Sequence, residues 1–186
     1  MRYIFIIFVL IVGISVSAFA TTETDEEKLF HVREAFIYNF LKFVQWPKEH
    51  PYSKTSEATI CIVGDHPFVE NFVQQTRHLP PNLRVNVQEP ASDNILPNCT
   101  ILFIGQDAQA RIPSLLSYTP HHPILTVSEA DKFVDNGGII EIVMVGKGVG
   151  LFRQDRINLR INLKKAESCG LNIDARLLQI AAEVIQ

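Results

Sequence analysis

Short, continuous apolar runs separated by amphipathic segments constrain the fold of this chain more than any other feature. Residues 100–104 form such a run after Thr100, and residues 58–63 have a similar buried-strand pattern that contains Thr59. Unbroken apolar character is typical of strands in a parallel sheet that is covered on both faces. Because helical patterns alternate with these runs, we predict an α/β fold, a three-layer sandwich with a mixed, partly parallel sheet flanked by helices.

The other elements are predicted from periodicity and from cap and turn residues. The further strands expected are residues 83–88, 123–127, 139–145 and 156–163. The helices expected are residues 26–46, 67–77, 107–116, 129–135, 163–166 and 175–185. Strict polar–apolar alternation over residues 156–163 indicates a half-exposed, antiparallel strand. The glycine-rich residues 146–150 fit neither nucleotide-loop spacing and predict a hairpin turn.

The first twenty residues have the features of an export signal. A single early charge, Arg2, precedes an apolar run over residues 4–14, and the stretch ends in an Ala18-x-Ala20 cleavage site. We therefore predict a cleavable signal peptide over residues 1–20 and one exported domain over residues 21–186, with an uncleaved N-terminal anchor as the alternative.

An oxidising compartment permits disulfides, and the chain has three cysteines. Cys61 lies in one buried-strand pattern and Cys99 directly precedes another. Because adjacent strands bring Cα atoms within disulfide reach, we predict a Cys61–Cys99 bridge, with Cys169 unpaired. The alternative is three buried thiols.

Composition and motifs exclude several functions. The formal net charge of −3 argues against electrostatic binding to nucleic acid or to an anionic membrane. The sequence contains no Cys or His spacing typical of zinc sites and no nucleophile elbow. We therefore predict a non-enzymatic protein without a metal or cofactor, although an active site assembled only in space would escape this reasoning.

The candidate binding residues lie mainly in the first predicted helix. Arg33 falls within its apolar arc, Tyr38 and Lys42 lie on or near its polar side, and Trp46 ends it. Arginine and aromatic side chains are favoured anchors in interfaces, although Arg33 could instead extend to solvent and Trp46 could belong to the core. A second candidate surface is the exposed face of residues 158–160, with Asn158 and Arg160.

Several segments resemble the YfiR-like family of periplasmic proteins. They are residues 35–47 (AFIYNFLKFVQWP), 60–68 (ICIVGDHPF), Cys99 with 101–104, 125–128 (LTVS), 137–140 (GGII), 161–163 (INL) and 170–173 (GLNI) with 176–178. The match runs in order along nearly the whole predicted mature chain. It departs from the family at Cys169, which has no second cysteine to pair with, and at Arg160, where many relatives carry an acid.

The resemblance implies a periplasmic regulator that represses an inner-membrane diguanylate cyclase by binding its periplasmic sensor region. Lower cyclic di-GMP would then reduce biofilm and exopolysaccharide output. The resemblance also implies the Cys61–Cys99 bridge, a homodimer, and an outer-membrane lipoprotein that relieves the repression. The alternative is a periplasmic small-ligand-binding module that signals to another receptor, such as a sensor histidine kinase.

Overall fold

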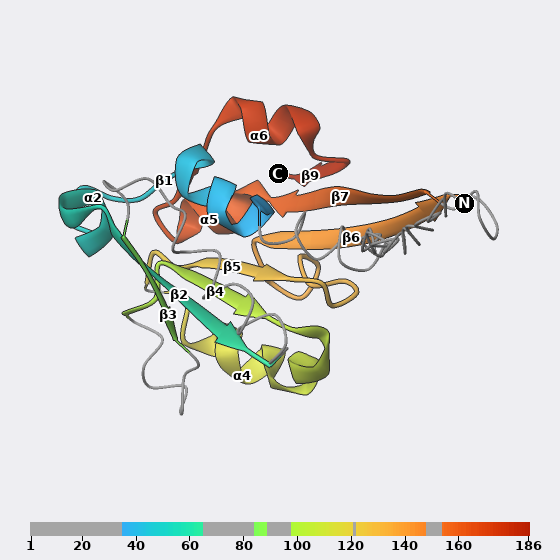
Figure 1. The fold of residues 1–186 in the computed structure, drawn as a ribbon, viewed down its shortest axis with the longest axis horizontal. Helices are drawn as coiled ribbons and strands as arrows, with labels where there is room; N and C mark the ends of the chain where they lie inside the picture. Colours follow the sequence, from blue (N-terminus) through green and yellow to red (C-terminus); the bar gives the residue numbers. More distant parts are fainter. Residues whose placement is uncertain (1–34, 65–83, 89–97, 121, 148–153) are drawn as a thin grey trace, which may run out of the picture.

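A seven-stranded mixed sheet forms the centre of the protein (Figure 1). The structure is a computed structural model that describes residues 35–64, 84–88, 98–120, 122–147 and 154–186. The strands are β2 (Glu57–Val63), β3 (Arg84–Gln88), β4 (Ile101–Ile104), β5 (Leu125–Ser128), β6 (Ile140–Lys147), β7 (Gln154–Asn162) and β9 (Glu183–Ile185). Their order is β3-β2-β4-β5-β6-β7-β9. The first five in this order are parallel, β7 is antiparallel to β6, and β9 is parallel to β7.

Helices lie on both faces of this sheet, which confirms the predicted sandwich (Figure 1). The helices are residues 35–43, α2 (Pro51–Thr55), the 3-10 helix η3 (Gln106–Arg111), α4 (Ile112–Ser117), α5 (Leu163–Ser168) and α6 (Ala175–Ile180). A small antiparallel pair, β1 (Val44–Gln45) with β8 (Asn172–Ile173), connects the end of the first helix to the start of α6.

Alternating side chains of each central strand supply two separate cores. In β2, Ile60 and Ile62 join the core beneath residues 35–43, α5 and α6, whereas Cys61 and Val63 join the core beneath η3 and α4. Successive side chains of a strand point to opposite faces, so an uninterrupted apolar run serves both cores. Residues 60–63 are at most 1% exposed.

The sequence correctly predicted the strands at β2 to β7, the caps of α5 and α6 and the helical conformation of residues 35–43. The side chain of Asn162 accepts a hydrogen bond from the Lys165 amide, and Asp174 accepts one from the Arg176 amide. Residues 107–116 are helical as predicted, with a 3-10 first part. The short helix α2 was not predicted.

Two predicted helix ends and one predicted helix, residues 129–135, are wrong. The first helix ends at residue 43 because Val44 and Gln45 pair with β8. Residues 131–137 form turns, with Lys132 at a φ of 60°, instead of a helix. The last helix ends at Ile180 because residues 183–185 pair with β7 as β9.

Some predictions fall outside the described residues. They are the signal peptide, Arg33, the start of the first helix, the helix at residues 67–77 and the tip of the hairpin within residues 146–150. Within the described part of the chain, no helix is both long enough and apolar enough to cross a membrane.

Candidate functional site

The predicted disulfide is confirmed and lies inside the second core. Cys61 of β2 bonds to Cys99, which lies two residues before β4, with Cα atoms 5.7 Å apart. Both residues are fully buried. Because β2 and β4 are parallel neighbours, the bridge fixes the start of β4 against the middle of β2. Cys169 is a buried free thiol whose Sγ lies 3.8 Å from the Thr119 carbonyl oxygen.

The helix of residues 35–43 presents one polar, partly aromatic face. Its buried side is formed by Ile37, Phe40 and Leu41. On the other side, Lys42 is exposed and its ammonium lies 4.4 Å from the ring centroid of the half-buried Tyr38. The ammonium also donates to the side-chain oxygen of Asn39 at 3.2 Å. Among the described residues no carboxylate pairs with Lys42, so its positive charge remains available on this face.

A second cation lies on a ring at the end of the same helix. The guanidinium of Arg176, in α6, lies 5.2 Å from the ring centroid of Phe43. Arg176 is neutralised by Asp174, which accepts two hydrogen bonds from the guanidinium. These bonds lower the pKa of Asp174 to about 2. Lys42, unlike Arg176, therefore has no carboxylate partner among the residues that the structure describes.

The other candidate at this end, Trp46, is buried. Its side chain is 7% exposed and packs against Tyr52 in an edge-to-face arrangement, with ring centroids 5.1 Å apart. Its indole Nε1 has no hydrogen-bond partner among the described residues. The neighbouring His50 caps α2 through Nδ1, which accepts from the Tyr52 amide, and burial lowers the pKa of His50. Of the candidates on the first helix, the structure thus brings Tyr38 and Lys42 together and places Trp46 in the core.

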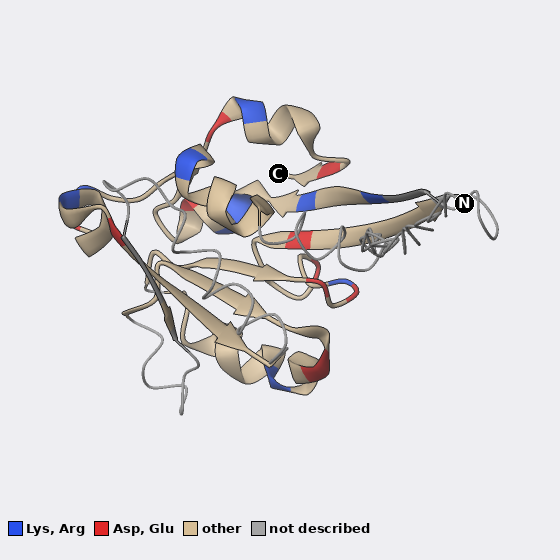
Figure 2. Cartoon of the chain, viewed as in Figure 1, with Lys and Arg blue, Asp and Glu red and all other residues tan. Residues whose placement is uncertain are grey.

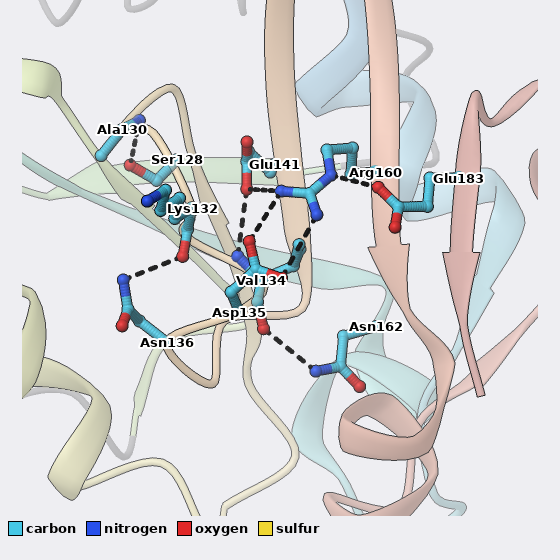
Figure 3. A network of polar contacts seen from close by, with 10 residues as sticks. All are labelled: Ser128, Ala130, Lys132, Val134, Asp135, Asn136, Glu141, Arg160, Asn162 and Glu183. Atoms are coloured by element: carbon cyan, nitrogen blue, oxygen red, sulfur yellow. Dashed lines mark hydrogen bonds and ion pairs between the residues drawn. The ribbon is translucent and has the colours of Figure 1, made fainter.

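Acidic and basic residues lie near one another on β6 and β7 (Figure 2), and Arg160 is at the centre of this charged cluster (Figure 3). Because Leu159 and Ile161 belong to the core beneath helix 35–43, Arg160 lies on the opposite face of the sheet. Its guanidinium pairs with Glu183 of β9, with Glu141 of β6 at 3.0 Å, and with Asp135 of the preceding turn at 3.0 Å. Strand register explains two of these partners, because Glu141 and Glu183 lie directly opposite Arg160 on its two neighbouring strands. Asn158, the other candidate on β7, is half-buried.

This cluster also fixes the turn of residues 131–137. Glu141 accepts a hydrogen bond from the Val134 amide at 3.2 Å, and the Asn162 side chain donates to the Val134 carbonyl (Figure 3). Hydrogen bonds to Arg160 lower the pKa of Asp135, and the three carboxylates raise the pKa of Arg160. One guanidinium and three carboxylates give the cluster a formal charge of −2.

Sequence reasoning identified Arg160 but not its three acidic partners. Polar alternation places Arg160 and its neighbours on one strand face, yet Asp135 and Glu183 come from segments predicted to be helical. Strand register brings Glu141 and Glu183 to the arginine, and the turn of residues 131–137 brings Asp135. Within the described ranges, no group of His, Cys, Asp or Glu side chains could hold a metal ion.

These features define a disulfide-bonded α/β domain with two cores on one mixed sheet. The chain matches the YfiR/HmsC-like family over residues 30–182, and it belongs to this family. The family resemblance inferred from the sequence is therefore confirmed. The buried disulfide is consistent with export to an oxidising compartment.

Two solved structures share the fold. One is a conserved domain protein from Vibrio cholerae, with 13% identity and a TM-score of 0.59 over 83% of this chain. The other is the ABC domain in complex with L-Trp from Streptococcus pneumonia, with 17% identity and a TM-score of 0.50 over 69% of this chain. The chain spans 60% and 55% of the lengths of these two proteins, and the likeness concerns the fold alone. No curated protein matches the chain.

Proposed function

We propose that this protein is a non-enzymatic periplasmic regulator that binds the periplasmic sensor region of a membrane-bound diguanylate cyclase and represses it. The observation that carries the proposal is the family match over residues 30–182. A signal peptide over residues 1–20 would export the chain. The resemblance adds two further proposals, a homodimer and an outer-membrane lipoprotein that relieves repression.

The face of helix 35–43 is the surface that we propose for the cyclase. Tyr38 offers a partly exposed ring, and Lys42 offers a charge that no described carboxylate balances. Aromatic and cationic side chains together favour a partner surface that contains carboxylates next to apolar groups. Repression requires that the regulator binds the inactive state of the cyclase more tightly than the active state, because only differential affinity shifts such an equilibrium.

Intracellular cyclic di-GMP tests this function. Deleting the gene should raise cyclic di-GMP, and complementation should restore it only when the protein is exported. Unchanged cyclic di-GMP in the deletion strain, with expression of the protein in the parent verified, would contradict the proposal.

A charge reversal tests the proposed surface separately from the function. Lys42→Glu should weaken repression, because a partner carboxylate would then face a like charge. Lys164→Glu is the matched control, since Lys164 is also exposed but lies on α5. Equal repression by the two folded variants would remove this face as the docking site.

The strand order supports a second candidate function, a small-ligand-binding module. The chain pairs β2 with β3 on one side and with β4 on the other, and open α/β sheets bind ligands at the carboxyl ends of strands where the order reverses. Gly64, with a φ of 76°, ends β2 there, and a Cβ at this position would overlap the carboxylate of Asp107. L-Trp is a suitable first probe because one of the fold relatives holds it. An unchanged melting temperature with L-Trp and other amino acids would count against this alternative.

A further inference from the structure

The C-terminal residues 178–186, here called the C-terminal strap, are thinly attached to the domain. Leu177 is the last buried residue of the chain, and every residue of the strap is half-buried or exposed. Ile180 is 63% exposed. A segment that buries so little apolar surface opens locally at a lower free energy than the core does.

The strand beneath the strap remains well supported without it. In β7, Leu159 is 1% exposed and Ile161 is fully buried. The other edge of β7 pairs with β6 along the whole length from Ile140↔Ile161 to Lys147↔Gln154. The strap's backbone contacts with β7 are the three-residue pairing of β9 and one further hydrogen bond, from the Ala182 amide to the Leu159 carbonyl at 2.8 Å. Two of its side chains, those of Leu178 and Ala181, pack partly buried against the first core.

The ion pair between Glu183 and Arg160 also adds little to the attachment of the strap. Glu183 pairs with Arg160, but Asp135 and Glu141 also pair with this guanidinium. Without Glu183 the cluster already has a formal charge of −1, so Glu183 adds a carboxylate to a site whose cation is balanced. When the strap detaches and Glu183 moves away, Arg160 still pairs with Asp135 and Glu141. No buried charge is then left without a partner.

We propose that the C-terminal strap is a detachable edge of the sheet, and that its release opens β7 to an extended polypeptide segment of a protein partner. The open edge of β7 would offer unpaired backbone N–H and C=O groups, which add a strand readily. The incoming segment would need an apolar residue opposite Ile161, where Val184 lies in the closed form. This proposal goes beyond the repressor function and does not depend on the identity of the partner.

Hydrogen exchange on a matched pair of full-length variants tests the detachment. Ala182→Pro removes the amide that donates to Leu159, whereas Ala182→Ser keeps it at an exposed position. In the proline variant the amides of residues 183–186 should exchange about tenfold faster than in the serine variant, while β4 and β6 keep their protection. Faster exchange throughout β4 and β6 would show that the strap is integral to the fold, and unchanged exchange would show that it does not detach. Either result overturns the proposal.

Peptide binding tests the opened edge. A synthetic peptide with the sequence of residues 178–186 should shift the β7 amide resonances of the proline variant, and a scrambled peptide should not. The serine variant should respond about tenfold more weakly, because its own strap competes for the same edge. A folded proline variant that binds neither peptide would overturn the proposal. Because these experiments use purified protein without a cyclase, their failure would leave the proposed repressor function untouched.

Discussion

Removing the Cys61–Cys99 bridge should lower the free energy of unfolding of the protein substantially. The bonded residues are 38 positions apart, and closing a loop of that length in the unfolded chain corresponds to about 4 kcal/mol of stability. Both cysteines are fully buried, so replacing either with alanine also deletes a buried sulfur at a cost of about 1 kcal/mol. Either single replacement should therefore cost about 5 kcal/mol.

Thermal unfolding of a small set of variants measures this loss. For a domain of this size, 1 kcal/mol corresponds to about 2–4 °C in melting temperature, so Cys61→Ala should lower it by about 10–20 °C. Cys99→Ala should give the same loss. The double variant should be only slightly worse than either single variant, because the bridge is lost once. Cys169→Ala is the control: it deletes a buried sulfur without opening a loop and should cost about 2–4 °C.

The pattern across these variants can refute the reasoning. If the Cys61 and Cys99 replacements were small and additive, the bridge would contribute through local packing and not through the unfolded chain. A loss in Cys169→Ala as large as in Cys61→Ala would lead to the same conclusion. Free-thiol counting on the denatured, unreduced protein should give one thiol for the wild type, and three would contradict the bridge itself.

Three further predictions follow from individual sites. Gly138→Ala should cost about 1–3 kcal/mol in chemical denaturation, because a Cβ at this position would overlap the Phe133 ring; an unchanged denaturation midpoint would contradict this packing. Burial lowers the folded-state pKa of His50 below its unfolded value of about 6.5, so its contribution to stability is full above that pH and is lost as pH falls through the folded pKa. His50→Asn, which keeps a capping oxygen but does not titrate, should flatten the pH dependence of the melting temperature in that window, and an unaltered slope would assign it to other groups. The pKa of Asp174, about 2, lies below its unfolded value, so Asp174→Asn should remove a stability gain that the wild type shows above about pH 4 and loses as pH falls to about 2; equal stability of the two proteins at pH 7 would refute this.

Local sequence signals predicted the central strands well. The whole of β4 and residues 60–63 of β2 are continuous apolar runs, and such a run has one stable placement, between two covered faces. The capping residues Asn162 and Asp174 likewise act on amides two or three residues away, so sequence alone locates them.

The errors arise where distant pairing overrides local periodicity. Residues 175–185 have helical spacing, with Leu177, Leu178 and Ala181 on one face. The helix nevertheless ends at Ile180, because the open edge of β7 satisfies the backbone groups of the following residues. Local patterns also did not predict the partners of Arg160. Arg160 was predicted on an exposed face, but Glu141 and Glu183 reach it through the strand register and Asp135 through a turn, and no local pattern reveals either.

The two proposed surfaces are physically connected through the start of α6. The Asp174 amide donates to the Phe43 carbonyl at 2.8 Å, and Arg176 lies over the Phe43 ring. Phe43 is the last residue of the helix that carries Tyr38 and Lys42. This helix therefore contacts the start of α6, the helix that leads into the C-terminal strap. A partner bound to the face of Tyr38 and Lys42 would therefore contact the helix to which the strap is tied. Coupling between the two sites requires that this contact changes the opening equilibrium of the strap, because a ligand with equal affinity for both states shifts nothing.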